Sequence, residues 1–315
     1  MPLPGWTSSR KYLIRVLVST VIAAPWVAHA ADNTPAENTA TGNAAAGSTA
    51  PASTATRAVP ETRPLWELGV VGGLGWLPDY PAAAQNHLQW IGLPYFVYRG
   101  KVLRAGDRGI VRGRLLHTDR VELDISLSGS FPADSEDNDA RKGMSDLDWL
   151  GEIGPRLQIT LARAARDAKV DLELPVRAVF STDFSNFGHQ GYIFAPELAY
   201  QNEHFGGRDI ALKLSLTAKY GNQDIADYFY GVPAASATAT RATYTAKAGY
   251  IGSRLQLGFI ETISSRWKMF AGLAADFHHG AANEQSPLFR NKTNYNVGAG
   301  FIWSFWQSAR RVRDD

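Results

Sequence analysis

Cysteine is absent from the 315 residues, and this absence excludes several classes of protein. Without thiols the chain has no disulfide scaffold, no cysteine-based zinc site, no catalytic thiol and no lipid-modified N-terminal cysteine. A large net charge is also missing, because 32 Lys and Arg residues nearly balance 30 Asp and Glu residues. Nucleic-acid-binding proteins usually carry a basic excess, so we expect no nucleic-acid partner.

Long apolar runs are scarce as well. The mean hydropathy is −0.21, and no apolar run beyond the N-terminal segment approaches the length of about 18 residues that a membrane-spanning helix needs. This disfavours a polytopic helical membrane protein. Soluble all-β and α/β proteins remain, together with outer-membrane barrels, whose alternating strands are only mildly hydrophobic on average.

The first 30 residues have the layout of a secretory signal peptide. Arg10, Lys11 and Arg15 form a basic region, residues 16–27 are mostly apolar, and Ala28-His29-Ala30 is a small-x-small cleavage site. We therefore predict cleavage after Ala30, with a retained signal anchor as the alternative. Loss of the three basic residues would change the formal charge from +2 to −1. Export without cysteine is typical of a bacterial envelope protein.

The segment 31–62 is rich in Ala, Thr, Asn, Ser, Gly and Pro and has few large apolar residues. Such a composition cannot bury enough surface to offset the entropy of the chain, so we predict a disordered linker. It would act as a tether or as a passive spacer. We place a β-barrel at 63–306 and a short polar tail at 307–315.

From Trp66 onward, apolar and polar residues alternate with period two, the side-chain period of a strand. In residues 121–128, for example, Val, Leu, Ile and Leu alternate with Glu, Asp and Ser. Similar segments predict strands at 66–76, 88–99, 109–117, 121–128, 148–161, 170–178, 190–203, 210–217, 243–250, 254–263, 267–273 and 293–306. Segments 101–117 and 241–263 leave the count uncertain, and we expect about 12 strands.

A soluble β-sandwich would share this alternation, but two further features favour a transmembrane barrel. The predicted strands have about 10 to 13 residues, whereas a tilted membrane strand needs about 9 to 11 and soluble strands usually have five or six. Aromatic residues gather near strand ends, as in interfacial girdles. They are Trp66, Trp76, Tyr98, Trp149, Tyr192, Tyr200, Tyr220, Tyr244, Tyr250, Trp267, Phe277, Phe305 and Trp306.

The last predicted strand contains Asn296, Gly298, Phe301 and Trp303 in a pattern that resembles the C-terminal signal of outer-membrane barrels. This resemblance implies recognition by the barrel-assembly machinery. Nine residues follow Trp306, although such barrels often end on an aromatic residue.

Several short segments resemble the MipA/OmpV family in their order and spacing. They are Pro78-Asp79-Tyr80-Pro81, then 94–100 (Pro-Tyr-Phe-Val-Tyr-Arg-Gly), then Asp227-Tyr228-Phe229-Tyr230-Gly231-Val232, and Ser286-Pro287-Leu288 before the last strand. In the third segment Tyr230 stands between Phe229 and Gly231, which departs from the family pattern. The resemblance covers about 66–306.

Membership would imply an all-β, antiparallel barrel embedded in the lipids of the outer membrane of a Gram-negative bacterium. It would also imply, more loosely, a non-enzymatic scaffold that joins a lytic transglycosylase to a bifunctional penicillin-binding protein in murein metabolism. Other members are linked to adhesion, osmotic response or antibiotic susceptibility. Fold alone does not fix which of these applies.

Residue patterns for catalysis or metal binding are weak, and we expect neither a metal nor another cofactor. His278 and His279 are adjacent, so on a strand they would point to opposite faces. Ser181, Asp183 and His189 lack a nucleophile elbow, and the acidic segment 134–139 lacks EF-hand spacing. The glycines of 69–75 do not form a dinucleotide fingerprint, and we expect them to let the strand bend or a side chain pack on the backbone.

Charged residues within the alternating segments should face the lumen, because a charge turned to lipid at the bilayer midplane costs about 2–4 kcal/mol. They could line a pore. Because both signs are mixed, we favour pairing across a narrow lumen that closes it. These residues are Glu122, Asp124, Glu152, Arg156, Asp171, Glu173, Arg177, Lys213, Lys219 and Lys247.

Three functional hypotheses follow from different classes. The first is the scaffold, binding through periplasmic turns, the linker or the tail with Arg310, Arg311 and Arg313. The second is a channel for small solutes. The third is an outer-membrane enzyme such as a lipid hydrolase, for which the sequence offers no convincing catalytic set. A surface adhesin is a further alternative.

Overall fold

The computed structural model describes residues 62–99, 104–105, 116–118, 120–165 and 167–313. The predicted signal peptide (1–30), nearly all of the predicted linker (31–62) and most of the predicted strand 109–117 lie outside the described residues.

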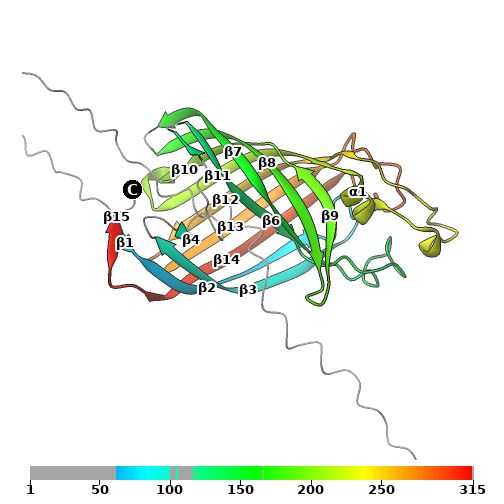
Figure 1. Cartoon of the computed structure of the whole chain (residues 1–315), viewed down its shortest axis with the longest axis horizontal. Coiled ribbons are helices and arrows are strands. Elements are labelled where there is room, and N and C mark those ends of the chain that lie inside the picture. Colours follow the sequence, from blue (N-terminus) through cyan, green and yellow to red (C-terminus); the bar gives the residue numbers. More distant parts are fainter. Residues whose placement is uncertain (1–61, 100–103, 106–115, 119, 166, 314–315) are drawn as a thin grey trace, which may run out of the picture.

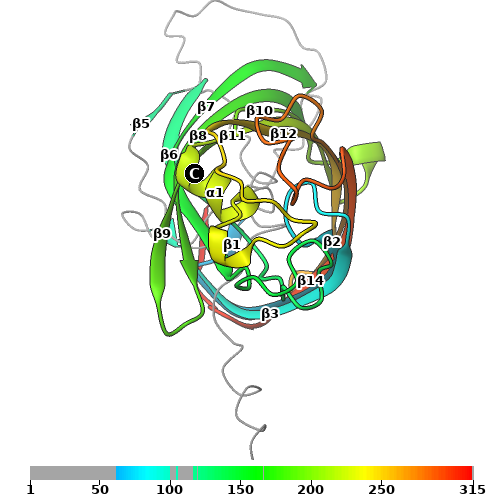
Figure 2. The same cartoon turned by 90° about the vertical axis from the view of Figure 1, so that its right-hand side faces the viewer.

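One antiparallel sheet of thirteen strands curls into a barrel (Figures 1 and 2). Its strands are β2 (Trp66–Pro78), β3 (Asn86–Arg99), β4 (Arg104–Ala105), β5 (Leu116–His117), β6 (Val121–Ser130), β7 (Trp149–Ala165), β8 (Ala168–Thr182), β9 (Phe187–Phe194), β10 (Glu197–Asn202), β11 (Ile210–Gly221), β12 (Gly249–Thr262), β13 (Trp267–Phe277) and β14 (Thr293–Gln307). A separate two-stranded ribbon pairs β1 (Thr62–Pro64) with β15 (Arg311–Arg313). Strand β15 lies within the segment 307–315 that was expected to be a polar tail.

Most sequence neighbours pair, and β14 pairs with β2, which joins the last long strand to the first. Among the described residues, β4 and β5 form the two edges of the sheet. Strands β9 and β10 both lie between β8 and β11 and are separated by Ala195 and Pro196. Proline cannot donate to a strand ladder, so this interruption has a local cause. Counting β9 and β10 as one gives twelve positions, which confirms the expected barrel of about 12 strands.

The prediction of a strand at 243–250 is wrong. Strand β12 begins only at Gly249, and residues 242–248 belong to a loop. Hydrogen bonds to side chains, and not strand pairing, hold the backbone of this loop. Asp227 accepts from Ala246 N–H at 2.6 Å, and Asn283 accepts from Lys247 N–H at 2.8 Å. Lys247 is consequently an exposed loop residue and does not line the lumen.

The helix α1 (Gln223–Tyr230) in the same loop was not predicted from the sequence. Asn222 caps its N-terminus by accepting from Ile225 N–H, and Gly231 ends it by donating to Asp227 O at 2.8 Å. Two 3₁₀ turns are also present, η1 (Phe205–Gly207) and η2 (Ala234–Ser236). No helix in the described part of the chain has the length and apolar content needed to cross a bilayer.

The outer face of the strands is apolar, as the alternation predicts. Large apolar side chains such as Leu74, Trp90, Leu216 and Val297 are exposed, while the alternate positions face inward. Aromatic residues, all exposed except the half-buried Trp66, form two girdles near the ends of the strands. One contains Trp66, Trp267, Trp303, Phe305 and Trp306, and the other contains Trp76, Trp90, Tyr192, Tyr220, Phe277 and Tyr295.

Aromatic rings pack on glycines of β2 and β14, which confirms the expectation that side chains pack on this backbone. The Phe301 ring lies over Gly72, where an added Cβ would be 2.7 Å from the ring. On the inner face, a Cβ at Gly300 would collide with the carbonyl oxygen of Gly72 and the ring of Phe270. These close contacts require glycine at both positions.

The connections at the two ends of the barrel differ in length. Those at the end away from β1 and β15 include the long loops 131–148, 222–248 and 278–292, whereas the fully described connections at the end with β1 and β15 are shorter, such as 263–266 (Figure 1). Most of the connection from β3 to β6 at that end lies outside the described residues. Outer-membrane barrels have short periplasmic turns and long external loops. We therefore infer that the end with β1 and β15, here called the terminal end, faces the periplasm.

We expect Gly300→Ala to lower the free energy of unfolding by about 1–3 kcal/mol, because the new methyl group overpacks the contact with Gly72 and Phe270. Gly92→Ala is the matched control, since nothing lies within 4 Å of its added Cβ. Urea unfolding followed by tryptophan fluorescence measures the free energy of unfolding of both variants. Equal stability of the two variants would contradict the packing assigned to Gly300.

Candidate functional site: the cap and the inner wall

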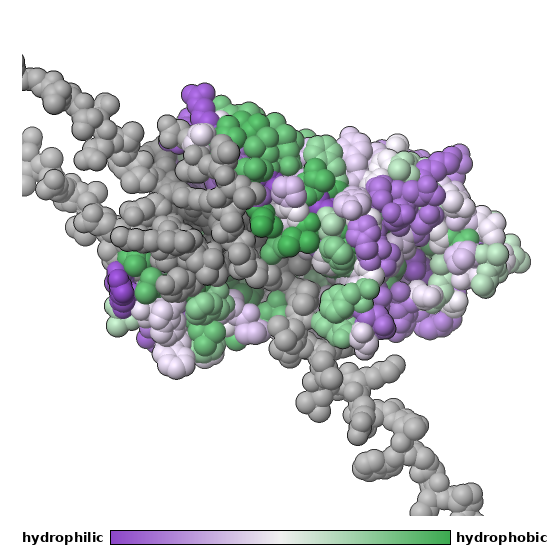
Figure 3. All heavy atoms as spheres, in the orientation of Figure 1, coloured by the Kyte–Doolittle hydropathy of each residue, from purple (hydrophilic) through white to green (hydrophobic). Residues whose placement is uncertain are grey.

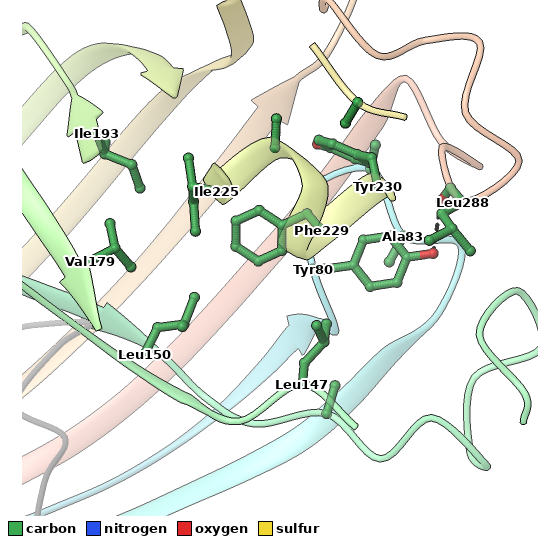
Figure 4. Packing of buried hydrophobic residues seen from close by; sticks show 14 of the residues in the cluster. Tyr80, Ala83, Leu147, Leu150, Val179, Ile193, Ile225, Phe229, Tyr230 and Leu288 are labelled. Carbon is green, nitrogen blue, oxygen red and sulfur yellow. Dashed lines mark hydrogen bonds between the residues drawn. The ribbon is translucent and has the colours of Figure 1, made fainter. Parts of the chain in front are cut away.

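Four loops pack together across the outer end of the barrel, and we call this assembly the cap (Figures 2 and 4). They connect β2 to β3, β6 to β7, β11 to β12 and β13 to β14. Their apolar side chains join inward-facing strand residues in one buried cluster. Its members are Tyr80, Ala82, Ala83, Ala133, Leu147, Leu150, Val179, Ile193, Ala195, Ile225, Ala226, Phe229, Tyr230, Val232, Ala246 and Leu288.

Two of the segments that resemble the family meet in this cap, although they are 208 residues apart. The Tyr80 hydroxyl donates to Leu288 O at 2.8 Å, and both residues are buried (Figure 4). Burial raises the pKa of Tyr80 to about 12. The neighbouring Pro81 and Pro287 are half-buried, and Ala82 has a positive φ of 66° that turns the chain back toward β3. The contact joins the first and last external loops.

The segment at α1 joins the same assembly. The Ser286 hydroxyl donates to Tyr230 O at 2.7 Å and accepts from Leu288 N–H at 3.2 Å. The Tyr228 hydroxyl accepts from Asp148 N–H at 2.8 Å, and Phe229 and Val232 are buried. An added Cβ at Gly231 would lie 2.6 Å from Asp227 O, so glycine fits the end of this helix. The residues of these three segments thus build the cap, whereas the segment 94–100 lies mainly on β3 toward the other end of the barrel.

Arg141 is a cap residue that the sequence did not single out. It is buried, and its guanidinium lies 5.7 Å from the centre of the Tyr80 ring. It donates to Ser145 O at 3.1 Å and to Phe229 O at 3.4 Å. Burial lowers the pKa of Arg141. This arginine connects the β6–β7 loop to the Tyr80 loop and to α1.

His278 is a structural residue of the cap and not half of a metal pair. Its Nε2 accepts from Ala82 N–H at 3.2 Å, so Nδ1 carries the proton and donates to Ile251 O at 2.9 Å. Burial lowers the pKa of His278. His279 is exposed, and the described residues contain no group of three His, Asp or Glu residues that could hold a metal ion.

The possible catalytic set Ser181, Asp183 and His189 is not assembled. Ser181 is buried and accepts from Gln190 Nε2 at 2.8 Å, whereas Asp183 holds the β8–β9 turn by accepting from Ser185 N–H at 2.8 Å. The ring of His189 packs against Tyr192 on the exposed face of the hairpin.

The acidic segment 134–139 forms part of the hydrophilic surface of the cap (Figure 3). Its polar groups hold the loop itself. Asp134 accepts from Glu136 N–H at 2.8 Å, and Asn138 donates to Asp79 at 2.6 Å. These contacts hold the segment in place and join it to the β2–β3 loop.

A network of ion pairs lines the inner wall on β6, β7 and β8. Arg156 is buried and donates to Asp124 at 2.5 Å and to Glu173 at 2.9 Å. Arg177 donates to Glu152 at 2.9 Å. The inward direction predicted for these charges agrees with their burial.

Further polar contacts join β7 to β8 and β10 to β11. Lys213 lies 2.6 Å from Glu197 on β10, and Asp171 accepts from Gln158 at 3.1 Å and from Thr160 at 2.8 Å. Glu122 and Lys219 occupy inward positions of β6 and β11. The pairs join neighbouring or next-neighbouring strands, so they run along the wall. The expectation that charges also pair across the lumen remains a prediction.

The residues of the predicted assembly signal lie on β14. The Asn296 side chain faces inward and donates to Asp276 at 2.7 Å, and Asp276 also pairs with Arg254 at 2.6 Å. Gly298 lies against the backbone of β2. Phe301 and Trp303 face outward, and both rings pack against Trp267. Their role in assembly remains a prediction.

We expect Arg156→Ala to destabilise the barrel by about 3–5 kcal/mol, because it removes the cation that pairs with two buried carboxylates, those of Asp124 and Glu173. Lys169→Ala is the control, and we expect it to have a smaller effect. The Lys169 ammonium lies 3.2 Å from Asp171, but Asp171 keeps its hydrogen bonds from Gln158 and Thr160 when this lysine is removed. The free energy of unfolding in urea measures the difference. A loss below about 1 kcal/mol for Arg156→Ala would contradict the network.

The cap should loosen as the pH falls below about 6.5, the usual pKa of histidine. The folded-state pKa of His278 is lower, so neutral His278 stabilises the cap fully above this pH. The stabilisation is lost as the pH falls toward the folded-state pKa. Protonated Nε2 can no longer accept from Ala82.

Hydrogen exchange of residues 79–85, corrected for the intrinsic rates, measures this effect. His279→Gln should keep the pH dependence, and His278→Gln should remove it. Protection of this loop that stays constant between pH 8 and pH 5 in the unsubstituted protein would rule out the role of His278.

Solved structures that align with the chain include an outer membrane channel from Pseudomonas putida F1, with 13% identity, a TM-score of 0.42, and coverage of 82% of this chain and 100% of the other. The NanC porin has 8% identity, a TM-score of 0.34 and coverage of 77% and 100%. Outer membrane phospholipase A from Escherichia coli has 9% identity, a TM-score of 0.33 and coverage of 76% and 93%.

No curated protein matches the chain. The family described as MltA-interacting protein MipA matches residues 69–305, which include all strands from β3 to β13 and most of β2 and β14. The apolar outer face and its two girdles fit an outer-membrane barrel of a Gram-negative bacterium. The chain belongs to the family of MltA-interacting proteins, MipA.

Proposed function

We propose that this protein is a non-enzymatic barrel, closed at its outer end, that holds murein enzymes at the periplasmic face of the outer membrane. A lytic transglycosylase is the first partner that the family's name suggests. A bifunctional penicillin-binding protein is the second partner that we propose. The cap is the single observation that carries the proposal, because a solute channel needs an unobstructed path along the barrel.

The packing of the cap supports a permanent closure. Its loops come from four connections, and they share one buried apolar cluster. Hydrogen bonds such as Tyr80 to Leu288 and Ser286 to Tyr230 tie separate loops together in buried surroundings. Buried and satisfied hydrogen bonds of this kind favour one rigid arrangement over a mobile lid.

The inner wall supports the same proposal. Arg156 is engaged by two buried carboxylates and Lys213 by the half-buried Glu197, and Asp276 is engaged by Arg254 and Asn296. A selectivity pathway usually presents charges of one sign to the solute. Here both signs neutralise each other along the wall.

A scaffold needs accessible binding surfaces in the periplasm. The terminal end offers short turns and the β1–β15 ribbon. We also propose the segment 31–62 as a tether and residues 307–315 as part of the contact surface. Cleavage after Ala30 and recognition of Asn296, Gly298, Phe301 and Trp303 by the barrel-assembly machinery complete the proposed route to the membrane.

We propose no catalytic activity, because the one candidate set for a lipid hydrolase is dispersed. Ser181 faces the barrel interior, while His189 lies on the exposed face of the β8–β9 hairpin. Nucleophilic catalysis requires these groups to lie within hydrogen-bonding distance of each other.

Two measurements on one preparation test the proposal. The folded protein, verified by heat-modifiable gel mobility, should give no discrete conductance steps in planar bilayers. Reconstituted in vesicles, it should co-sediment with a purified lytic transglycosylase, and vesicles without the protein are the control.

Discrete steps from the folded, unsubstituted protein would contradict the closed barrel and favour a channel. A silent barrel that captures neither a lytic transglycosylase nor a bifunctional penicillin-binding protein would overturn the scaffold. The surface adhesin would then be the remaining alternative, tested by binding of the cap to host surfaces.

A further inference from the structure

The terminal end of the barrel continues directly into a two-stranded ribbon. Strands β2 and β14 stay hydrogen-bonded as they leave the barrel: Ser308 N–H donates to Trp66 O at 2.9 Å, and Leu65 N–H donates to Arg310 O at 2.8 Å. Pro64 then lies opposite Arg311 in the ribbon. Arg310 and Arg311 are consequently fixed close to the end of the membrane-spanning strands.

The depth of this region in the bilayer is set by tryptophans. Trp66 and Trp306 meet edge to face with ring centres 5.9 Å apart, and Trp267 and Trp303 stack at 5.3 Å. Trp306 is 63% exposed on the outer face. Tryptophan prefers the level of the lipid headgroups, so the chain just beyond this girdle lies beside the headgroups of the periplasmic leaflet.

Three exposed arginines lie just beyond the girdle, and we call them the arginine row: Arg266, Arg310 and Arg311. Arg266 lies in the β12–β13 turn, where its carbonyl oxygen accepts from Ser304 N–H of β14 at 2.8 Å. The same turn accepts from the Gln307 side chain at Ser265 O, at 2.7 Å. The turn is thereby held beside the end of β14, close to the ribbon.

The arginine row is free of carboxylate partners within the described residues, since no ion pair there includes any of the three. This contrasts with Arg156, Arg177 and Lys213 on the inner wall. Within the described residues, the opposite end of the barrel exposes more carboxylates than basic side chains. The carboxylates are Asp134, Glu136, Asp137, Asp139, Asp146, Asp183 and Asp224, and the basic residues are Lys142, Lys247, Arg290 and Lys292.

We propose that the arginine row binds the phosphate groups of anionic phospholipids in the periplasmic leaflet of the outer membrane. Guanidinium groups bind phosphate through paired, charge-assisted hydrogen bonds. Anionic lipid surfaces attract basic residues that lie at the edge of a membrane-spanning segment. The site would fix the vertical position of the barrel and keep the terminal end against the leaflet.

A lipid fits the position of the row better than an acidic protein does. Arg310 is four residues from Trp306, and its backbone bonds to the residue before Trp66. The same girdle that faces lipid therefore holds the arginines at headgroup depth. An acidic protein segment is the competing occupant, and the experiment below separates the two.

The test measures the binding of phosphatidylglycerol and of phosphatidylcholine to the folded full chain in a non-ionic detergent by native mass spectrometry. The unsubstituted protein should hold its first phosphatidylglycerol more tightly than phosphatidylcholine. The double variant Arg310→Gln/Arg311→Gln should weaken phosphatidylglycerol binding about 30-fold, since each arginine near an anionic lipid contributes about fivefold. Phosphatidylcholine binding should not change.

The control variant Lys142→Gln/Arg290→Gln removes two exposed positive charges from the cap and should leave both affinities unchanged. Heat-modifiable mobility verifies that each variant folds. Unchanged phosphatidylglycerol binding in the Arg310 and Arg311 variant would overturn the proposal, as would an equal loss in the control. If that variant keeps its lipid but no longer captures a lytic transglycosylase, the row is a protein-docking surface and the lipid proposal fails, whereas the scaffold stands.

Discussion

The inward direction of the strand charges is the constraint on which the rest of the structure depends. A strand displaced by one residue would turn every inward side chain outward. Asp124, Arg156 and Glu173 would then face lipid, at a cost of about 2–4 kcal/mol for an Arg or Lys at the midplane. Their mutual hydrogen bonds add a second requirement, because each needs its partner on the neighbouring strand. Register and membrane orientation are therefore fixed by the same residues.

The cap follows from this register. Strand β14 pairs with β2, so the loops that follow β2 and precede β14 emerge side by side. This arrangement brings Tyr80 to Leu288 across 208 residues of sequence. The helix α1 and Arg141 then join the cluster from the two other long loops. A barrel whose strands are held in one register can close its outer end with loops that are unrelated in sequence order.

The two ends of the barrel differ in their loops and in the balance of their exposed charges. The cap is rich in exposed carboxylates, and its interior is apolar. The terminal end has short turns, a tryptophan girdle and exposed arginines. This difference supports separate tasks, with closure at one end and binding in the periplasm at the other.

The sequence was sufficient for the barrel because alternation, strand length and aromatic girdles are local properties of each strand. It was insufficient for the cap. Residues 243–250 alternate like a strand, but Asp227 and Asn283 bind their backbone as a loop. Helix α1 has only eight residues, and Arg141 looked like one charge in a polar loop. Contacts between distant loops determine all three, and no local pattern encodes those contacts.

The orientation of the barrel is the claim on which both the scaffold and the lipid site rest, and single-cysteine labelling tests it most directly. The chain contains no cysteine, so the unsubstituted protein gives no background labelling. Lys142→Cys in the cap should react with a membrane-impermeant maleimide on intact cells. Ser264→Cys in the β12–β13 turn should react only after the outer membrane is opened. Labelling of Ser264→Cys but not Lys142→Cys on intact cells would contradict the account.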